Sequence, residues 1–307
     1  MTQISRTVYS RELQKQLFPV SDFYRKSISE TGLAADAATF EIPNLGSVNE
    51  AKEDAPTVLP LKVVKSDDSK VNGTMKLLYC DPILIENEEA IVMNYSKRQN
   101  KQLQQAASLN AKAGDYAAYQ WLPTLSANVV ESTGSARATN VIGLTGTRKA
   151  LTKADVLGIY NKLLRMNAKQ LPGALYGLLT ADAYTDLLAI ADFVDYEKIG
   201  RADMLAQGVI GKICGIEILV RSKNGHIGAL FTSGNVRTKT ITAASTNRPV
   251  NLFWHSGMVC HAESNVTTLI NENDATYLGT VINSTVRFGA EKCREDQAGV
   301  LAIAEIA

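Results

Sequence analysis

The strongest periodic pattern of apolar positions lies between residues 152 and 170 and predicts an amphipathic helix. Val156, Ile159, Leu163 and Leu164 recur at the spacing that places side chains on one face of a helix. Thr152 precedes this run and Asp155 follows three residues later, a combination that caps the first backbone N–H groups of a helix. A helix with one buried face is therefore expected here.

After this helix the pattern changes to short apolar runs separated by turn residues, which indicates an α/β region. Residues 174–179 form a first run, and Thr180 is placed to cap a second helix through Tyr184, Leu187 and Leu188. Further strands are predicted at residues 215–220, 228–231, 252–261 and 278–288. No internal repeat of fixed period accompanies them.

The first part of the chain has few apolar positions. Short helices are predicted at residues 11–17 and 22–29, on either side of Pro19. Strand-like runs at 59–65 and 74–80 flank a polar segment, which predicts an extended hairpin with its tip at residues 67–73. Such a hairpin cannot bury a core of its own, so we expect it to be disordered or completed by another subunit.

A long polar helix is predicted between Asn87, a favourable capping residue, and Gly114, the first helix breaker. It would measure roughly 40 Å. Between Tyr95 and Gln105 its only aliphatic residue is Leu103. A helix of this polarity is expected to bridge elements across solvent or to lie in a wet subunit contact, with an ordinary surface helix as the alternative.

Composition and charge narrow the class of protein. With 45% hydrophobic and 21% charged residues among 307, the chain is globular rather than disordered or fibrous. Its net charge of +1 means that binding to nucleic acid or membrane would need a local patch. No segment is apolar enough to span a membrane or to act as a signal peptide, so we expect cytosolic synthesis. The four widely separated cysteines favour reduced thiols.

Candidate catalytic residues are few. His255, Cys260 and His261 fall on one predicted strand, where the two histidines would share a face, but a core or surface role is favoured over a metal site. Residues 208–213 resemble a phosphate loop, yet only two residues separate the glycines and Ile213 replaces the hydroxyl, so a turn is favoured. The sequence therefore predicts no catalytic, cofactor-binding or metal-binding residue.

Charged clusters offer weaker candidates. A cation could bind the acidic group Asp182, Asp186, Asp192, Asp195 and Glu197, although a solvated face is favoured. Phosphate could be contacted by two basic groups, namely Lys97, Arg98 and Lys101, and Arg148, Lys149 and Lys153. Neither basic group is interleaved with aromatic residues, so no platform for stacking single-stranded bases is expected.

The order of the expected elements resembles the major capsid proteins of tailed double-stranded DNA bacteriophages, which have the HK97-like fold. Residues 40–46, FEIPNLG, resemble the start of that family's extended loop, and residues 94–98, NYSKR, its spine helix. Residues 146–155 are similar to the join between its two domains, and residues 171–173 and 183–188 to phage coat sequences. The segment 287–300 resembles the closing strand and turn of many such coats.

This resemblance implies an α+β fold with five regions. They are an N-terminal arm at residues 1–39, an extended loop at 40–86, a peripheral domain with the spine helix at 87–150, an α/β axial domain at 151–249, and return strands mainly to the peripheral domain at 250–307. Contacts between subunits are expected from Lys62, Lys65, Asp67, Asp68 and Lys70 of the loop and from Lys97, Arg98 and Lys101 of the helix.

The resemblance also implies a structural role without enzymatic activity. The chain would self-assemble, through hexamers and pentamers, into an icosahedral shell around double-stranded DNA, without sequence specificity and without a membrane. Assembly would take place in the bacterial host cytoplasm, with a portal and a separate scaffolding protein, since only residues 1–39 precede the loop. Two alternatives stay open: an encapsulin-like bacterial shell with protein cargo, and an oligomeric enzyme with an α/β substrate domain.

Overall fold

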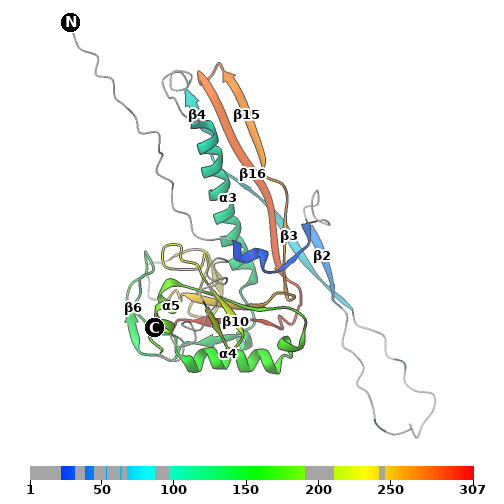
Figure 1. Cartoon of the computed structure of the whole chain (residues 1–307), viewed down its shortest axis with the longest axis vertical. Helices are drawn as coiled ribbons and strands as arrows, with labels where there is room; N and C mark the ends of the chain where they lie inside the picture. Colours follow the sequence, from blue (N-terminus) through cyan, green and yellow to red (C-terminus); the bar gives the residue numbers. More distant parts are fainter. Residues whose placement is uncertain are drawn as a thin grey trace.

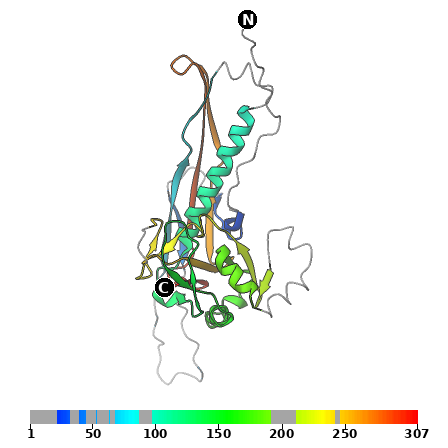
Figure 2. The ribbon, with the colours of Figure 1, turned by 90° about the vertical axis from the view of Figure 1, so that its left-hand side faces the viewer.

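The computed structural model describes residues 22–31, 39–44, 53, 63, 68–86, 97–190, 211–241 and 246–307. They form a rounded body and a long arm that stands on it (Figure 1). The arm consists of helix α3 (Lys97–Trp121) and the long strands β3 (Ser69–Tyr79), β15 (Thr267–Asp274) and β16 (Gly279–Lys292). The body consists of helices α4 (Lys153–Arg165) and α5 (Ala181–Leu188) and a sheet (Figure 2).

The sheet of the body has six strands. In spatial order they are β5 (Val129–Glu131), β17 (Val300–Ala304), β13 (Val250–His255), β8 (Leu175–Leu179), β10 (Ile216–Val220) and β9 (Gly211–Ile213). β8 runs parallel to β10 and antiparallel to β13, which is antiparallel to β17. The strands predicted at 174–179 and 215–220 are confirmed, whereas the turn predicted at 208–213 is wrong for the last three residues, which form β9.

Both faces of this sheet are buried, which explains its nearly continuous apolar runs. Phe253 and Leu301 belong to the cluster that packs against α4 and α5. Their chain neighbours Trp254 and Ala302 point to the opposite face and pack against the end of α3. The alternation of side chains along each strand therefore joins two cores through one sheet.

The two helices of the body begin where the sequence predicts. The hydroxyl of Thr152 accepts a hydrogen bond from the Asp155 backbone N–H, and the Asp155 carboxylate accepts one from the N–H of Thr152. Thr180 caps α5 in the same way, accepting from the N–H of Ala183. Helix α4 ends at Arg165 rather than at the predicted residue 170, and a 3₁₀ turn follows it.

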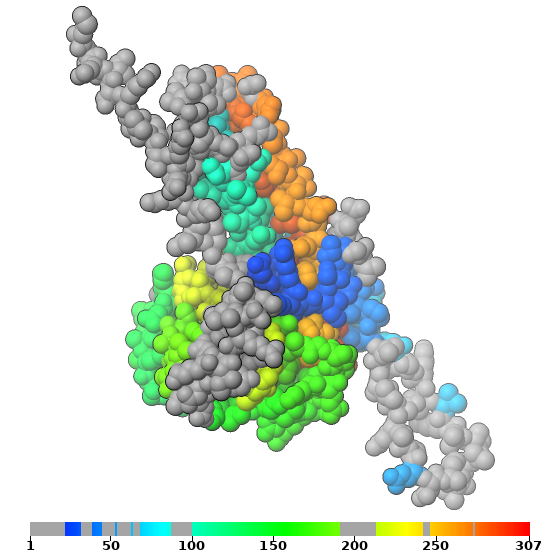
Figure 3. Space-filling model, viewed as in Figure 1, coloured from blue at the N-terminus to red at the C-terminus, as the bar shows by residue number. Residues whose placement is uncertain are grey.

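The sheet of the arm has seven strands arranged around β16. Its main path is β1 (Ile28–Ser29), β14 (Val259–Glu263), β16, β3 and β2 (Thr39–Asn44), while β15 and β4 (Ile83–Glu86) pair with the distal half of β16. The strand predicted at 278–288 thus continues to Lys292, and β15 was not predicted. Figure 3 shows β15 in orange along one side of the arm.

Helix α3 packs along β16 despite its polar sequence. The prediction of its end at Gly114 is wrong: Gly114 is buried inside the helix, which continues to Trp121. Its predicted cap, Asn87, lies outside the described residues. The side chain of Gln105 is buried against the sheet, where its amide donates to the carbonyls of Asp81 and Ile282. One side of this helix is therefore a packed contact rather than a bridge across solvent.

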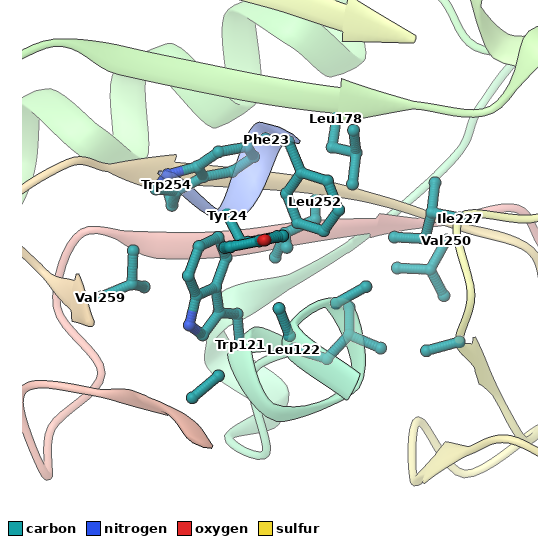
Figure 4. Close-up of a cluster of buried hydrophobic side chains, with 14 of the residues drawn as sticks. Phe23, Tyr24, Trp121, Leu122, Leu178, Ile227, Val250, Leu252, Trp254 and Val259 are labelled. Carbon is teal, nitrogen blue, oxygen red and sulfur yellow. The ribbon is translucent and has the colours of Figure 1, made fainter. Parts of the chain in front are cut away.

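A cluster of aromatic side chains ties the arm to the body (Figure 4). The rings of Phe23 and Trp121 meet edge to face at 5.8 Å, and Trp121 lies 5.5 Å from Trp254 of the body sheet. The two indole N–H groups also find partners, the carbonyls of Cys260 and Lys26. Large aromatic surfaces with satisfied polar atoms contribute strongly to a core, so the arm is anchored at its base.

The extended hairpin is present, but its tip is not where the sequence predicts. Residues 69–73 belong to β3 and pair with β2, with Asn72 opposite Glu41 and Gly73 opposite Phe40. The Phe40 ring covers Gly73 so closely that a Cβ there would lie 2.1 Å from the ring. Asn-Gly thus serves packing in a strand rather than a turn. The predicted strand 59–65 lies almost entirely outside the described residues.

Several predicted elements near the N-terminus and in the loops also differ. The helix predicted at 22–29 is a 3₁₀ turn, η1 (Asp22–Arg25), followed by β1, and the helix predicted at 11–17 lies outside the described residues. The remaining short elements are η2 (Ser126–Asn128), β6 (Ala136–Ala138), β7 (Thr147–Lys149), η3 (Ala168–Gln170), β11 (Leu230–Phe231) and β12 (Arg237–Thr238). No helix in the described ranges is long and apolar enough to cross a membrane.

Candidate interaction surfaces

The histidines do not form a site. The prediction that His255 and His261 share a face is wrong, because a turn after His255 places them in β13 and β14, which belong to different sheets. His255 Nδ1 accepts from the backbone N–H of Gly257, and His261 Nδ1 lies 2.8 Å from the Ser27 hydroxyl. Burial lowers the pKa of both rings. Within the ranges that the structure describes, no group of three potential metal ligands occurs.

The acidic stretch supplies ion pairs instead of an open cation site. Asp182 and Asp186 both contact the guanidinium of Arg137, which also lies 2.9 Å from Glu305. Burial of Arg137 opposes its charge, but the three carboxylates outweigh burial and raise its pKa. Burial raises the pKa of Glu305, which Asn251 and Thr180 also hold by hydrogen bonds. Asp192, Asp195 and Glu197 lie outside the described residues.

The basic group Arg148, Lys149 and Lys153 cannot contact phosphate as a set, because Arg148 is buried. Arg148 is fully buried, and its guanidinium donates to the backbone carbonyls of Asn247 and Thr147. Burial lowers its pKa. The guanidinium therefore organises the segment around Asn247, and the prediction of a phosphate contact by Arg148 is wrong.

The predicted subunit-contact residues are spread over the hairpin and the start of α3. Lys62, Lys65 and Asp67 lie outside the described residues, and Asp68 directly precedes β3. Lys70 pairs with Glu41 across the β2–β3 ladder at 2.7 Å, with both side chains more than half exposed. Lys97 and Arg98 occupy the first turn of α3, and Lys101 donates to the side chain of Gln104 at 3.4 Å. Their contact with a second subunit stays a prediction.

The arm carries an exposed apolar face that the sequence reasoning missed. The register of β16 with β3, β4 and β15 places four large side chains on the side of the sheet opposite α3, namely Leu77, Tyr79, Leu84 and Leu269. Leu77 is 57% exposed, Tyr79 68% and Leu269 58%. We call these four residues the open face. Alternation within 74–80 was its only signal in the sequence, because β15 had not been recognised.

A hollow of about 560 Å³ lies at the base of the open face, where β14 leads into β15. Leu77 forms part of its wall, and the other lining residues include Glu263, Thr267, Thr285 and Arg287. The lining is mixed in charge and open to solvent, unlike the enclosed apolar cavities that hold small ligands. The hollow therefore extends the open face and adds polar groups to it.

Comparisons with known proteins identify the fold. No protein-family model matches the sequence, and no curated protein matches it. By structure the chain is similar to the capsid of cyanophage P-SCSP1u (TM-score 0.66, 16% identity, 99% of this chain and 93% of that chain). It is also similar to the capsid of Ralstonia phage GP4 (TM-score 0.66, 12% identity, 99% and 96%). A structure from Mycobacterium phage Che8 matches with TM-score 0.62 at 15% identity over 99% and 98%.

These similarities extend over almost the whole length of both chains in each comparison. The arm, the extended hairpin and the α/β body are therefore all part of the shared architecture. The chain has the α+β fold of phage capsid proteins, as the order of its elements predicts.

Proposed function

We propose that this protein is a major capsid protein, a structural subunit that assembles with copies of itself into an icosahedral shell. The observation that carries the proposal is the match of 99% of the chain to phage capsid structures that are themselves matched over 93% and 96% of their length. If the two proteins shared only one domain and differed in function, part of at least one chain would stay unmatched. Here the arm and hairpin match together with the body.

The open face supports this function on physical grounds. Burying a large apolar side chain that is exposed in the free chain contributes roughly 1.5–3 kcal/mol. Leu77, Tyr79, Leu84 and Leu269 lie in one sheet, so a neighbouring subunit can cover them together. Each such contact is modest, but a closed lattice repeats it in every subunit. An arm that holds an apolar sheet away from the body is suited to such repeated contacts.

The regions and partners of the assembled state follow from the proposal. Residues 1–39 form the N-terminal arm, 40–86 the extended loop, 87–150 and 250–307 mainly the peripheral domain, and 151–249 the axial domain. Hexamers and pentamers of this chain form the lattice around double-stranded DNA, with a portal and a separate scaffolding protein. The protein resides in the virion and assembles in the host cytoplasm.

A non-enzymatic role is part of the same proposal. Its support is that the three histidines are buried and that Asp182 and Asp186 are engaged by Arg137. The phage origin of the compared capsids favours a genome over the protein cargo of an encapsulin-like shell. An oligomeric enzyme has no comparable support.

Electron microscopy of the full-length chain tests the proposal. The protein is expressed alone and with its neighbouring reading frames, fractionated on a sucrose gradient and examined in negative stain. We expect closed shells, tubes or separate hexamers and pentamers. Small uniform oligomers in both preparations at every salt concentration would overturn the proposal. Shells that contain protein cargo but no nucleic acid would favour the encapsulin-like alternative.

A further inference from the structure

Four basic side chains converge beside the last turns of α3 without a carboxylate partner. Lys239 lies over the rings of Tyr116 and Tyr119, with its Nζ 4.7 and 4.5 Å from their centroids. Arg237 lies 4.9 Å from the ring of Tyr119, and Lys76 of β3 lies 5.6 Å from that of Tyr116. Lys112, one helical turn before Tyr116, completes the group. We call Lys76, Lys112, Arg237 and Lys239 the basic patch; Figure 2 shows the segment of β11 and β12, in yellow, beside the lower end of α3.

The carboxylates nearest to the basic patch are already paired with other cations. Asp115 binds Arg221 and Lys223, and Glu291 binds Lys292. Asp81 lines the neighbouring hollow, but Lys112 and Lys223 line it as well. Among the residues that the structure describes, none forms an ion pair with the basic patch. The patch therefore holds more positive charge than its surroundings neutralise.

Holding these cations together has an energetic cost. Burial, and then the charges of Lys76 and Lys112, lower the pKa of Lys239, and the carboxylate of Asp115 offsets this only in part. The faces of Tyr116 and Tyr119 offset part of this repulsion through cation–π attraction. An anion bound at the patch would offset the remaining repulsion between the cations, because an opposite charge nearby favours the charged form of an amine. The local geometry thus favours an anionic partner with several charges.

We propose that the basic patch binds the phosphate backbone of double-stranded DNA and thereby marks the surface of the subunit that faces the lumen. This inference rests on the proposed function. Its chemistry favours phosphate contact without base reading, since the ring faces are already occupied by Lys239 and Arg237 and cannot stack on bases.

The location of the patch agrees with this assignment. Lys76 lies on the side of β3 that faces α3, whereas its neighbour Leu77 lies on the open face. The two sides of the arm therefore differ in chemistry: the open face carries large apolar side chains beside a hollow of mixed charge, and the side that faces α3 carries the basic patch. An apolar surface suits contact with protein, and a surface of unpaired cations suits release of counterions from DNA.

The test measures DNA binding separately from assembly. Binding of a fluorescent 30-base-pair duplex to the unassembled full-length chain is followed by anisotropy between 50 and 200 mM salt. The variant carries K76Q, K112Q and K239Q, and keeps Arg237 because its guanidinium also donates to the carbonyls of Tyr119 and Gln120. The control carries K162Q in α4 and K169Q in η3, away from the basic patch. Lys162 donates to the carbonyl of Ala127, and Lys169 lies over the ring of Tyr160.

We expect the triple variant to bind at least about tenfold more weakly at the lowest salt and to lose about 2.7 from the slope of log affinity against log salt. The control variant should bind like the parent. Parental affinity in the triple variant would overturn the inference, as would tighter binding of poly-glutamate than of DNA, which would assign the patch to an acidic protein. Circular dichroism verifies that the variant is folded.

Electron microscopy of the same variant separates the two proposals. If the variant forms normal shells and the substitutions leave its DNA binding unchanged, the basic patch is not the DNA-binding site, but the capsid function stands. DNA binding that depends on the patch in a protein that never forms shells refutes the capsid function.

Discussion

The Nη2 atom of Arg137 lies 2.9 Å from Oε2 of Glu305 and so joins β6 to the segment that follows β17. Glu305 is only 1% exposed, and the same guanidinium also holds Asp182 and Asp186 of α5. One cation thereby links the β6–β7 hairpin, helix α5 and the segment after β17. Removing it would leave a buried carboxylate without its main partner.

We predict that Arg137→Met lowers the free energy of unfolding by about 3–5 kcal/mol, the range for breaking a buried ion pair from one side. Urea denaturation followed by circular dichroism measures the loss. Lys70→Met is the matched control, because the Lys70–Glu41 pair has a similar separation of 2.7 Å but lies on the surface. It should cost less than about 1 kcal/mol. Equal losses in the two variants would contradict a structural role for the buried network.

The three buried histidines predict a loss of stability in acid. Burial lowers the pKa of His226, His255 and His261 below the ordinary value of 6.5. The unfolded chain therefore binds protons first as the pH falls below 6.5, so the folded state loses stability from there down to the folded pKa values. Each histidine contributes at most about 1.4 kcal/mol per pH unit.

The variant His261→Gln should show a shallower fall in unfolding free energy between pH 7 and 5 than the parent. The comparison with the parent is needed because Glu305 acts in the opposite direction. Its raised pKa means that the folded state holds the proton more tightly, so its contribution to stability falls as the pH rises above 4.5. An unchanged slope would contradict the prediction, because it would show that the folded and unfolded chains protonate His261 over the same pH range.

Gln105 is predicted to contribute more to stability than the other glutamines of its helix. Its side chain donates to the carbonyls of Asp81 and Ile282 and accepts from the hydroxyl of Ser284 at 2.9 Å. Gln105→Ala removes all three hydrogen bonds from a buried position and should cost about 1–3 kcal/mol. Gln104→Ala, one residue earlier and partly exposed, should cost a few tenths of that. Thermal unfolding of both variants compares the two positions directly.

The open face predicts a defect in assembly without a defect in folding. Leu77→Ser with Tyr79→Ser removes two exposed apolar side chains. The free energy of unfolding of the unassembled chain should therefore stay within about 0.5 kcal/mol of the parent value. The concentration needed for shells or capsomers should rise about tenfold or more, as sedimentation velocity would show. Ile142→Ser is the control, because this residue is 67% exposed on the body. Normal assembly of the double variant would remove the open face from the subunit contacts.

The elements that the sequence predicts correctly are those in which local and tertiary signals agree. Helix α4 has a capping box at Thr152 and Asp155, which the structure confirms. Its predicted apolar face is buried as expected except at Leu164, which is 43% exposed. β8 and β10 are apolar on both faces because helices and the aromatic cluster cover the two sides of their sheet. In these segments a residue's neighbours in sequence already determine its environment.

The errors arise where a distant residue decides the local structure. Asn72 and Gly73 have the composition of a turn, but the ring of Phe40 on the paired strand requires a residue without Cβ. Gly114 lies inside α3 and is buried, so tertiary packing there overrides the low helix propensity of glycine. The open face depends on pairing between strands far apart in sequence, and the basic patch on the packing of β3 and the segment around Arg237 against α3, so a local pattern identifies neither surface as a whole.

The position of β17 has a consequence for biosynthesis. This strand, Val300–Ala304, lies between β5 and β13 in the interior of the body sheet, and β16 holds the arm sheet together. Translation must therefore pass residue 292 before the arm sheet can close and residue 304 before the body sheet can close. Until then the emerging polypeptide lacks the finished surfaces that copies of it would recognise. Both sheets are therefore completed only late in synthesis, because β16 and β17 are among the last segments to be translated.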